Sequence, residues 1–222
     1  MAFPEWLETR VHMRDYIRHQ RGRMFESDFM EFFSKGHPAI PFVWWIPVGA
    51  LVLGSAISSG VTTPLTALMF FPVGVLTWQF LEYFFHRYVF HWQGIGPISR
   101  RIHDIVHGYH HKYPDDDHRL VFPIGASIPT FALIWLILWA IFPMRIAVPY
   151  WSMILVGYLY YDFTHWSTHF RKPRNAYEKK LWAHHMIHHF VDIDANFGID
   201  NRWMDRIVGT LKERSPNEPT LE

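Results

Sequence analysis

The residues of this 222-residue chain best suited to chemistry are histidines, and they stand in two similar blocks. The blocks are His107-Gly108-Tyr109-His110-His111 and His185-Met186-Ile187-His188-His189. In each block three imidazoles occupy positions i, i+3 and i+4, so a helical segment presents them on one face, where they can converge on one metal pair. This spacing predicts a metal centre held by imidazole nitrogens.

Two further pairs complete the set, His86 with His91 and His165 with His169. Ten neutral nitrogen ligands divided between two metals give five each, which leaves each octahedral ion one open position for water or oxygen. His86 and His91 are five residues apart, about 140° around an ideal helix, so they either serve different metals or the helix unwinds between them. The candidate catalytic and metal-binding residues are His86, His91, His107, His110, His111, His165, His169, His185, His188 and His189.

Other polar residues near the blocks are candidates for support. Two divalent ions with only neutral ligands would bring a charge of about +4 into a partly dry site, so we expect acidic groups hydrogen-bonded to the outer imidazole nitrogens. Each candidate is alternatively an ordinary interface residue, and the two histidines among them are alternatively substrate-facing. The candidates are Glu82, His103, Asp104, Asp162, His184 and Asn196, with Asp192 and Asp194 also nearby. His12, His19, His37 and His118 are expected outside the site.

Four uncharged runs of nearly the length that a bilayer requires are expected to position these residues. Their links are short enough only for helical hairpin turns. We therefore predict an all-α integral membrane protein of one domain (1–222), with four transmembrane helices in two hairpins and a histidine-rich helical cap over a di-metal site. The predicted spans are 40–59, 64–83, 123–142 and 146–163, and the cap comprises 84–120 and 164–214. Residues 1–37 mix apolar and basic side chains, which predicts an interfacial amphipathic arm or, alternatively, a soluble helical arm.

Basic residues set the expected orientation. Of the 21 Lys and Arg residues, only Arg145 falls on the far side of the predicted spans. The positive-inside rule then places both termini, the 82–120 loop and all sixteen histidines in the cytoplasm. The expected location is a bacterial inner membrane or the endoplasmic reticulum.

Composition excludes several classes of protein. Aromatic residues make up 18% of the chain, with 11 Trp, which is typical of membrane interfaces. The absence of cysteine excludes disulfides, thiolate metal sites and cysteine catalysis, and a net charge of +1 gives no footprint for nucleic acid. The spans hold no histidine between their ends, which argues against a metal transporter. Ten ligands exceed the four of a closed structural metal site.

The order and spacing of these motifs resemble those of the fatty acid hydroxylase and sterol desaturase superfamily of membrane di-metal oxygenases, most closely its fatty acid 2-hydroxylases. The resemblance covers roughly residues 80 to 210. Besides the histidines, it rests on Glu82-Tyr83, Arg87, Pro114, Arg119-Leu120-Val121-Phe122-Pro123, Tyr161-Asp162-Phe163-Thr164, Phe190, Asn196-Phe197-Gly198 and Trp203 through Gly209-Thr210.

This resemblance implies O2-dependent hydroxylation of a fatty acid or acyl lipid at the carbon next to the carbonyl, with sterol or carotenoid hydroxylation or desaturation as the alternative. It implies two iron ions, for which zinc can substitute in purified protein. Many relatives carry a fused cytochrome b5 domain, which Gly36-His37-Pro38 matches only faintly. The electrons are therefore expected from a separate cytochrome b5-like or ferredoxin-like protein.

Overall fold

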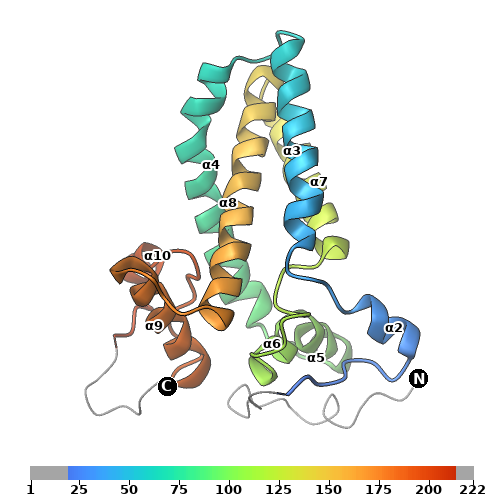
Figure 1. Ribbon diagram of the computed structural model, residues 1–222, viewed down its shortest axis with the longest axis vertical. Coiled ribbons are helices and arrows are strands. Elements are labelled where there is room, and N and C mark those ends of the chain that lie inside the picture. The colour runs from blue at the N-terminus through green and yellow to red at the C-terminus, as the bar shows by residue number, and fades with distance from the viewer. Residues whose placement is uncertain (1–19, 214–222) are drawn as a thin grey trace.

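The computed structural model describes residues 20–213, and within this range every regular element is a helix. The elements are α2 (Asp28–Phe33), α3 (Ile40–Ser58), α4 (Pro64–Phe84), the π-helix η1 (Phe85–Phe90), α5 (Pro97–His103), the π-helix η2 (Asp104–Gly108), α6 (Tyr109–Lys112), α7 (Ile124–Ile141), α8 (Met144–Phe170), α9 (Ala176–Phe190) and α10 (Trp203–Val208). The predicted all-α class is confirmed for the described residues. Four long helices form an upright bundle, and the short helices gather at its lower end (Figure 1).

Helix α8 is the centre of the bundle, and it packs against α4, α3 and α7. The core between these helices is rich in aromatic rings, and Trp78 stacks on Phe131 with ring centroids 5.6 Å apart. Trp45 Nε1 donates to Ser127 Oγ at 3.0 Å, and Trp151 Nε1 donates to the Phe131 carbonyl at 2.9 Å. These indole N–H groups are thus buried without losing hydrogen bonds.

Two glycines allow α4 and α8 to approach closely. A Cβ atom on Gly157 would lie 2.7 Å from the Cβ of Trp78, and one on Gly74 would lie 2.4 Å from the Cβ of Met153. Small residues at such crossings let two helix backbones pack together where larger side chains would hold them apart. The α4–α8 contact therefore depends on both glycines.

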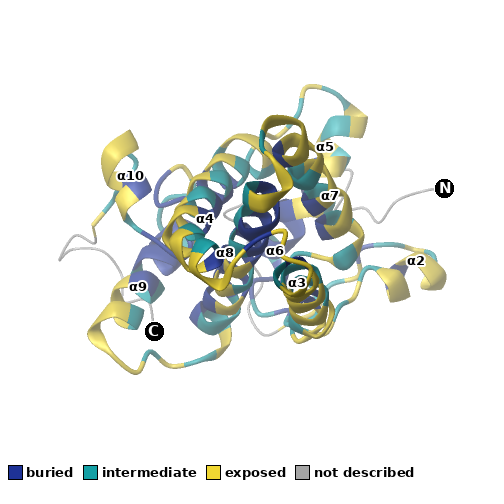
Figure 2. Ribbon diagram, turned by 90° about the horizontal axis from the view of Figure 1, so that it is seen from above, coloured by how far each residue is buried: buried dark blue, intermediate teal, exposed yellow. Residues whose placement is uncertain are grey.

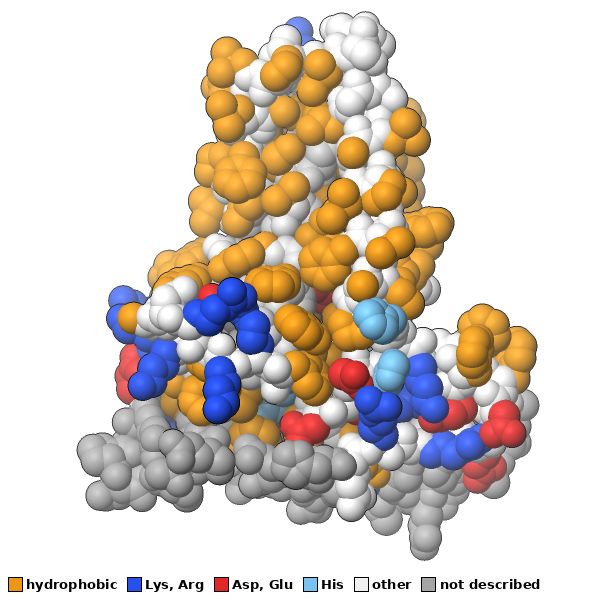
Figure 3. Space-filling view, in the orientation of Figure 1, with side chains coloured by type: hydrophobic (Ala, Val, Ile, Leu, Met, Phe, Trp, Pro, Cys, Tyr) orange, Lys and Arg blue, Asp and Glu red, His pale blue; other side chains and the backbone are white. Residues whose placement is uncertain are grey.

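The outer surface of the bundle is apolar, and most charged side chains on the face shown in Figure 3 lie at its lower end. Viewed from above, the exposed residues of the long helices face outward and the buried ones face the bundle axis (Figure 2). Three helices are long and apolar enough to cross a membrane, namely Ile40–Ser58, Pro64–Phe90 and Ile124–Ile141. They match the first three predicted spans, although the second continues beyond residue 83.

The predicted fourth span, 146–163, lies within α8, which is as long as Pro64–Phe90 but less apolar than all three candidates and is not among them. Many of its side chains are buried by the neighbouring helices, so its inner face does not meet the surroundings. The predicted arm is described only from residue 20. There it forms the short α2, whose Phe29, Phe32 and Phe33 are exposed.

Candidate metal centre

Ten histidines of the described chain gather into two groups of five. In each group, one nitrogen from every ring lies within 4.8 Å of the corresponding nitrogens of the other four. The first cluster consists of His86, His91, His107, His111 and His188. The second cluster consists of His110, His165, His169, His185 and His189. These are the ten residues singled out from the sequence; their role as metal ligands stays a prediction.

The Nε2 atoms of neighbouring rings are as close as ligands of one ion would be. The separation is 3.0 Å between His86 and His107, 2.9 Å between His107 and His111, and 2.8 Å between His169 and His185. Two ligands at right angles around an ion, with metal–nitrogen bonds of about 2.1 Å, lie roughly 3.0 Å apart. The distances therefore fit several nitrogens placed around one cation in each cluster.

Two rings of the first cluster indicate which nitrogen faces inward. Nδ1 of His188 donates to the Ala195 carbonyl at 2.7 Å, and Nδ1 of His86 donates to the Phe197 carbonyl. A neutral imidazole that is protonated at Nδ1 presents only a lone pair at Nε2. Lone pairs that face one another without a proton between them repel, whereas a cation among them is bound by all of them. The donor set therefore fits a metal ion.

Burial keeps these rings in the form that binds metal. It lowers the pKa of the buried imidazoles in the cap well below the usual value, and neighbouring imidazoles lower it further. Near neutral pH the rings are thus uncharged, and few protons compete with a metal for their nitrogens. The residues concerned are His107, His110, His111, His185, His188 and His189.

A π-helix brings His86 and His91 into the same cluster. Helix η1 continues α4, and the N–H of His91 donates to the His86 carbonyl, five residues back, at 3.1 Å. The wider turn brings residues i and i+5 nearly into line, whereas an α-helix would separate them by about 140°. Of the two alternatives raised by this spacing, the structure shows the local unwinding.

Each histidine block contributes to both clusters. In the block at 107–111, the first and last histidines belong to the first cluster, and His110 belongs to the second. In the block at 185–189, the first and last histidines belong to the second cluster, and His188 belongs to the first. The segments that carry the blocks, η2 with α6 and α9, therefore connect the two clusters.

The outer nitrogens of two clustered rings, His86 and His188, meet backbone carbonyls. His103, which belongs to neither cluster, likewise donates from Nδ1 to the Phe90 carbonyl at 2.6 Å. Four other outer nitrogens are buried and have no hydrogen-bond partner within the described protein. They are Nδ1 of His111, His165, His185 and His189. Burial lowers the pKa of His169, and the nearby carboxylate of Asp115 opposes that shift, so one ring of the second cluster has an acidic neighbour that we did not predict.

Glu82 and Asp162 hold backbone groups. Glu82 accepts from the N–H of Ile199 at 2.9 Å, and Asp162 accepts from the N–H of Phe122 at 3.2 Å. Both carboxylates are buried, so they act by ordering loops that pass beside the clusters. Asn196, which has a positive φ of 57°, also orders its loop, since its side chain donates to the His184 carbonyl at 3.2 Å and accepts from the N–H of Lys212 at 2.7 Å.

Among the described residues, no hydrogen bond joins the remaining acidic candidates to a clustered histidine ring. Burial raises the pKa of Asp104 to about 6, although nearby Arg101 opposes the shift. Asp192 forms an ion pair with Lys212 at 3.1 Å and accepts from the N–H of Asp194. His37 and His118 lie outside both clusters as expected, and His12 and His19 lie outside the described residues.

Asp205, which we did not predict, is fully buried in α10. Its carboxylate accepts from the N–H groups of Phe197 and Gly198, both at 2.8 Å, and from the Thr210 hydroxyl at 2.7 Å. It also accepts from Nε2 of His184 at 3.0 Å. Burial alone would raise the pKa of Asp205, but the His184 hydrogen bond and the others outweigh it and lower that pKa. The sequence signal that could have revealed Asp205 is a carboxylate inside the short, largely apolar segment of α10.

A buried ionic network joins the segment before α3 to α6. The Arg119 guanidinium forms ion pairs with Glu31 and, at 2.9 Å, with Asp116. The Tyr109 hydroxyl donates to Asp116 at 2.9 Å. Because Tyr109 directly precedes His110, this network fixes the short helix that supplies rings to both clusters.

The sequence is similar to that of known fatty acid hydroxylases. The fatty acid hydroxylase family matches residues 71–210. The dihydroceramide fatty acyl 2-hydroxylase FAH2 of Arabidopsis thaliana is 39% identical over 190 residues, which are 85% of this chain and 79% of the relative. Human fatty acid 2-hydroxylase is 31% identical over 219 residues, or 89% of this chain, which spans only 59% of that protein.

A solved structure has a similar overall fold. The structure described as full-length scs7p, with only the hydroxylase domain visible, superposes with a TM-score of 0.84 at 27% sequence identity. The alignment covers 99% of this chain and 82% of the scs7p chain. The family match includes every histidine of both clusters. With its all-helical fold and a histidine set suited to two metals, this chain belongs to the fatty acid hydroxylase family.

Proposed function

We propose that this protein hydroxylates the acyl chain of a membrane lipid at the carbon next to the carbonyl. The observation that carries the proposal is the pair of five-histidine clusters at one end of an apolar helical bundle. The relatives named above are a dihydroceramide fatty acyl 2-hydroxylase and a fatty acid 2-hydroxylase, which favours an acyl substrate over a sterol or carotenoid.

The first cluster would hold one metal ion and the second cluster the other. Neutral imidazoles suit iron(II), and zinc can occupy the same donors. Bound iron supplies the reduction of O2 and the oxidising power to remove hydrogen from an unactivated C–H bond. For each turnover one oxygen atom enters the C–H bond and the other leaves as water, which requires two electrons from a separate redox protein and two protons.

The chain's own residues position the rings and exclude water. Most of the clustered rings are buried, while His91 and His169 are half-buried. Carbonyls of the 195–197 loop hold two rings with their lone pairs inward. This preorganisation places the nitrogens before a metal arrives, so little reorganisation is needed at the reacting centre.

The position of the clusters supports attack next to the carbonyl. His86 directly follows α4, and His165 and His169 lie in the last turns of α8, at the lower end of the bundle in Figure 1. The ester or amide carbonyl of a membrane lipid lies at the boundary between its hydrocarbon and polar regions, and carbon 2 is the first methylene beyond it. A lipid in the adjoining leaflet would therefore bring carbon 2 to the depth of the clusters.

We further propose that α8 is a fourth span and that the cap and both termini are cytoplasmic. The burial of α8 among three apolar helices and the charge bias support this topology. Because the chain has no cysteine, single cysteines report cleanly on accessibility. A cysteine in place of Asn175 should react from the cytoplasmic side, and one in place of Ser59 only from the opposite side. The reverse pattern would overturn the topology.

The proposed reaction is tested by lipid mass spectrometry of cells with and without the protein. We expect 2-hydroxy acyl lipids only with the wild-type protein, and none with the His110→Ala variant at equal amount in the membrane. Oxidised sterols or carotenoids without 2-hydroxy acyl lipids would replace the proposed substrate class. Hydroxylation at another position of the chain would overturn the assignment of carbon 2.

A further inference from the structure

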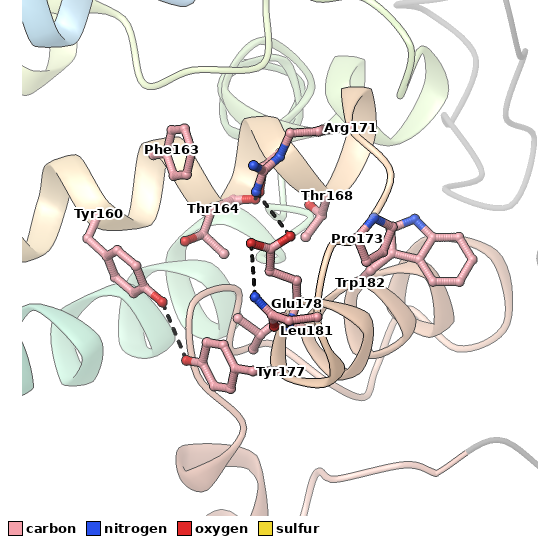
Figure 4. A pocket seen from close by; sticks show the side chains of 12 residues that line it. Tyr160, Phe163, Thr164, Thr168, Arg171, Pro173, Tyr177, Glu178, Leu181 and Trp182 are labelled. Carbon is pink, nitrogen blue, oxygen red and sulfur yellow. Dashed lines mark hydrogen bonds and ion pairs between the residues drawn. The ribbon is translucent and has the colours of Figure 1, made fainter.

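A pocket lies between the end of α8 and the start of α9, outside both clusters (Figure 4). Its cavity volume is about 120 Å³, and it is partly open to the outside. Phe163, Leu181 and Trp182 give it apolar walls, and Thr164, Thr168 and Arg171 supply polar groups. Apolar walls with a few convergent polar groups are typical of a small-molecule site.

The charges beside this pocket cancel. The guanidinium of Arg171 forms an ion pair with Glu178 at 3.2 Å, and Glu178 also accepts from the N–H of Arg174 at 2.8 Å. With its charge matched, Arg171 offers little net attraction to a phosphate or a free carboxylate. The Glu178 contact, however, uses only one terminal nitrogen of this guanidinium, and Arg171 lines the pocket. Another N–H group of the guanidinium can donate to a neutral acceptor such as a carbonyl oxygen.

The hydroxyls of the pocket add acceptors. Ser167 donates to the Thr164 carbonyl at 3.0 Å, and Thr168 donates to the His165 carbonyl at 2.8 Å. Since each proton is used within α8, each hydroxyl oxygen keeps its capacity to accept. The pocket therefore offers one donor for a carbonyl and acceptors for an O–H or N–H group.

An apolar stripe on α8 leads from the bundle to this pocket. Val156, Tyr160 and Phe163, at positions i, i+4 and i+7, share one face and are 38%, 39% and 42% exposed. Tyr160 and Phe163 also line the pocket. The rings of His165 and His169 join the second cluster instead. A lipid chain on this stripe would thus lie on the outside of α8.

We propose that this pocket is a second lipid site, which binds the head of an uncharged lipid that carries a carbonyl beside a hydroxyl or amide. The lipid carbonyl accepts from the Arg171 guanidinium, the lipid O–H or N–H donates to the Ser167 and Thr168 hydroxyls, and one chain follows the α8 stripe. Ceramide and diacylglycerol share this chemistry. The site goes beyond the proposed reaction, because its occupant stays outside the histidine clusters.

The test uses the full chain in phosphatidylcholine nanodiscs with three photoactivatable probes, namely a ceramide, a diacylglycerol and a phosphatidylserine. After irradiation, mass spectrometry locates the crosslinked residues. We expect the uncharged probes to label residues 160–182 and phosphatidylserine to label them weakly. Capture of ceramide but not diacylglycerol would identify the amide as the recognised group, and the converse would identify the ester. Equal labelling by phosphatidylserine would overturn the proposal.

Variants separate this site from general lipid contact. Ser167→Trp should fill the pocket and remove the labelling. Arg171→Gln should weaken it roughly tenfold through the lost charged donor, whereas Arg174→Gln, which removes the same charge three residues away, should leave it unchanged. Thermal stability and metal content establish that each variant is folded. Undiminished labelling in folded Arg171→Gln protein would overturn the proposal.

A further variant makes failure of the site distinguishable from failure of the proposed reaction. His110→Ala should retain the labelling while losing hydroxylation, because the pocket does not include the clusters. If its labelling vanished together with activity while the fold persisted, the probe would be reporting the reaction site, and the second lipid site would be excluded.

Discussion

The two clusters contain the same number of histidines but are positioned in different ways. The second cluster relies mainly on regular helices, since His165 and His169 stand at i, i+4 on α8, and His185 and His189 do so on α9. The first cluster relies on the π-helical turn η1 and on a loop. The geometry of the second cluster is therefore mostly local, whereas that of the first depends on contacts across the chain.

Hydrogen bonds show the same difference. Two rings of the first cluster donate to carbonyls of the 195–197 loop, and Asp205 holds that loop through two N–H groups. In the second cluster, Nδ1 of His165, His185 and His189 has no partner within the described protein. A change behind the loop should thus affect the first cluster selectively.

The largest expected effect comes from removing one ring from either cluster. His188→Ala and His110→Ala should each abolish 2-hydroxylation, a loss beyond the roughly 100-fold limit typical of residues behind the ligands. Each should also lower bound metal from roughly two ions per chain toward one. Product and metal are measured per amount of membrane-inserted protein. His118→Ala should stay within a few-fold of wild type, and near-normal activity in either test variant would remove the di-metal assignment.

A change at Asp205 separates the clusters more sharply. In Asp205→Asn, the amide NH2 replaces an acceptor oxygen and faces N–H donors, so the 195–198 loop should shift. Metal affinity of the first cluster should fall by about 10–100-fold while the second keeps its ion. The measurement is metal retained per chain during titration with a chelator.

Asp116→Asn serves as the matched control for that variant, because Asp116 is also a buried carboxylate that accepts several hydrogen bonds. It should weaken both clusters alike, since it acts through α6. Equal loss of both ions in Asp205→Asn would contradict the selective role of the loop.

A smaller effect is expected where α4 meets α8, the helices that lead to the two clusters. Gly157→Ala would push its new Cβ against Trp78, and such overpacking costs about 1–3 kcal/mol in the free energy of unfolding. Thermal denaturation of the purified protein measures the loss. Gly54→Ala on α3 is the control, because no atom lies within 4 Å of the added Cβ. It should be neutral or stabilising, and a loss in both variants would argue against a specific close approach.

The smallest effect is a dependence on pH outside the clusters. Burial alone would raise the pKa of Glu31, but the Phe25 N–H and Arg119 outweigh it and lower that pKa below the usual 4.5. A lowered carboxyl pKa contributes stability that is present above 4.5 and lost as pH falls through the folded-state value. The melting-temperature difference between wild type and Glu31→Gln should therefore shrink below about pH 4.5. A constant difference across that range would exclude this linkage.

Local patterns in the sequence were enough for much of the site. The blocks and the uncharged runs pointed to the ten histidines and three of the spans, because i, i+4 spacing and apolar length act within one helix. The assignment of each ring to a cluster could not be read in this way. His110 belongs to a different cluster from the other two histidines of its block, and so does His188. This assignment depends on how η2, α6 and α9 meet.

The hydrogen bonds that orient the rings could not be predicted from local sequence patterns either. His86 meets the carbonyl of Phe197, which is 111 residues away. Backbone carbonyls occur at every position and leave no mark in a sequence, whereas carboxylates do, and we accordingly expected carboxylates. Asp205 reaches the rings only through the loop, so its distance in sequence hid its role. Metal identity and the side of the membrane remain predictions.

The central place of α8 bears on how this protein is made. As the proposed fourth span it carries Arg145 near one end and Asp162 within it, so alone it would partition into a bilayer less readily than α3, α4 or α7. Its buried face is covered only when those three helices are already present. Biogenesis should therefore be ordered: α3 and α4 enter first as a hairpin, and α7 then carries α8 in beside them. Synthesis must pass residue 170 before the bundle can close, and residue 189 before all ten histidine rings can meet.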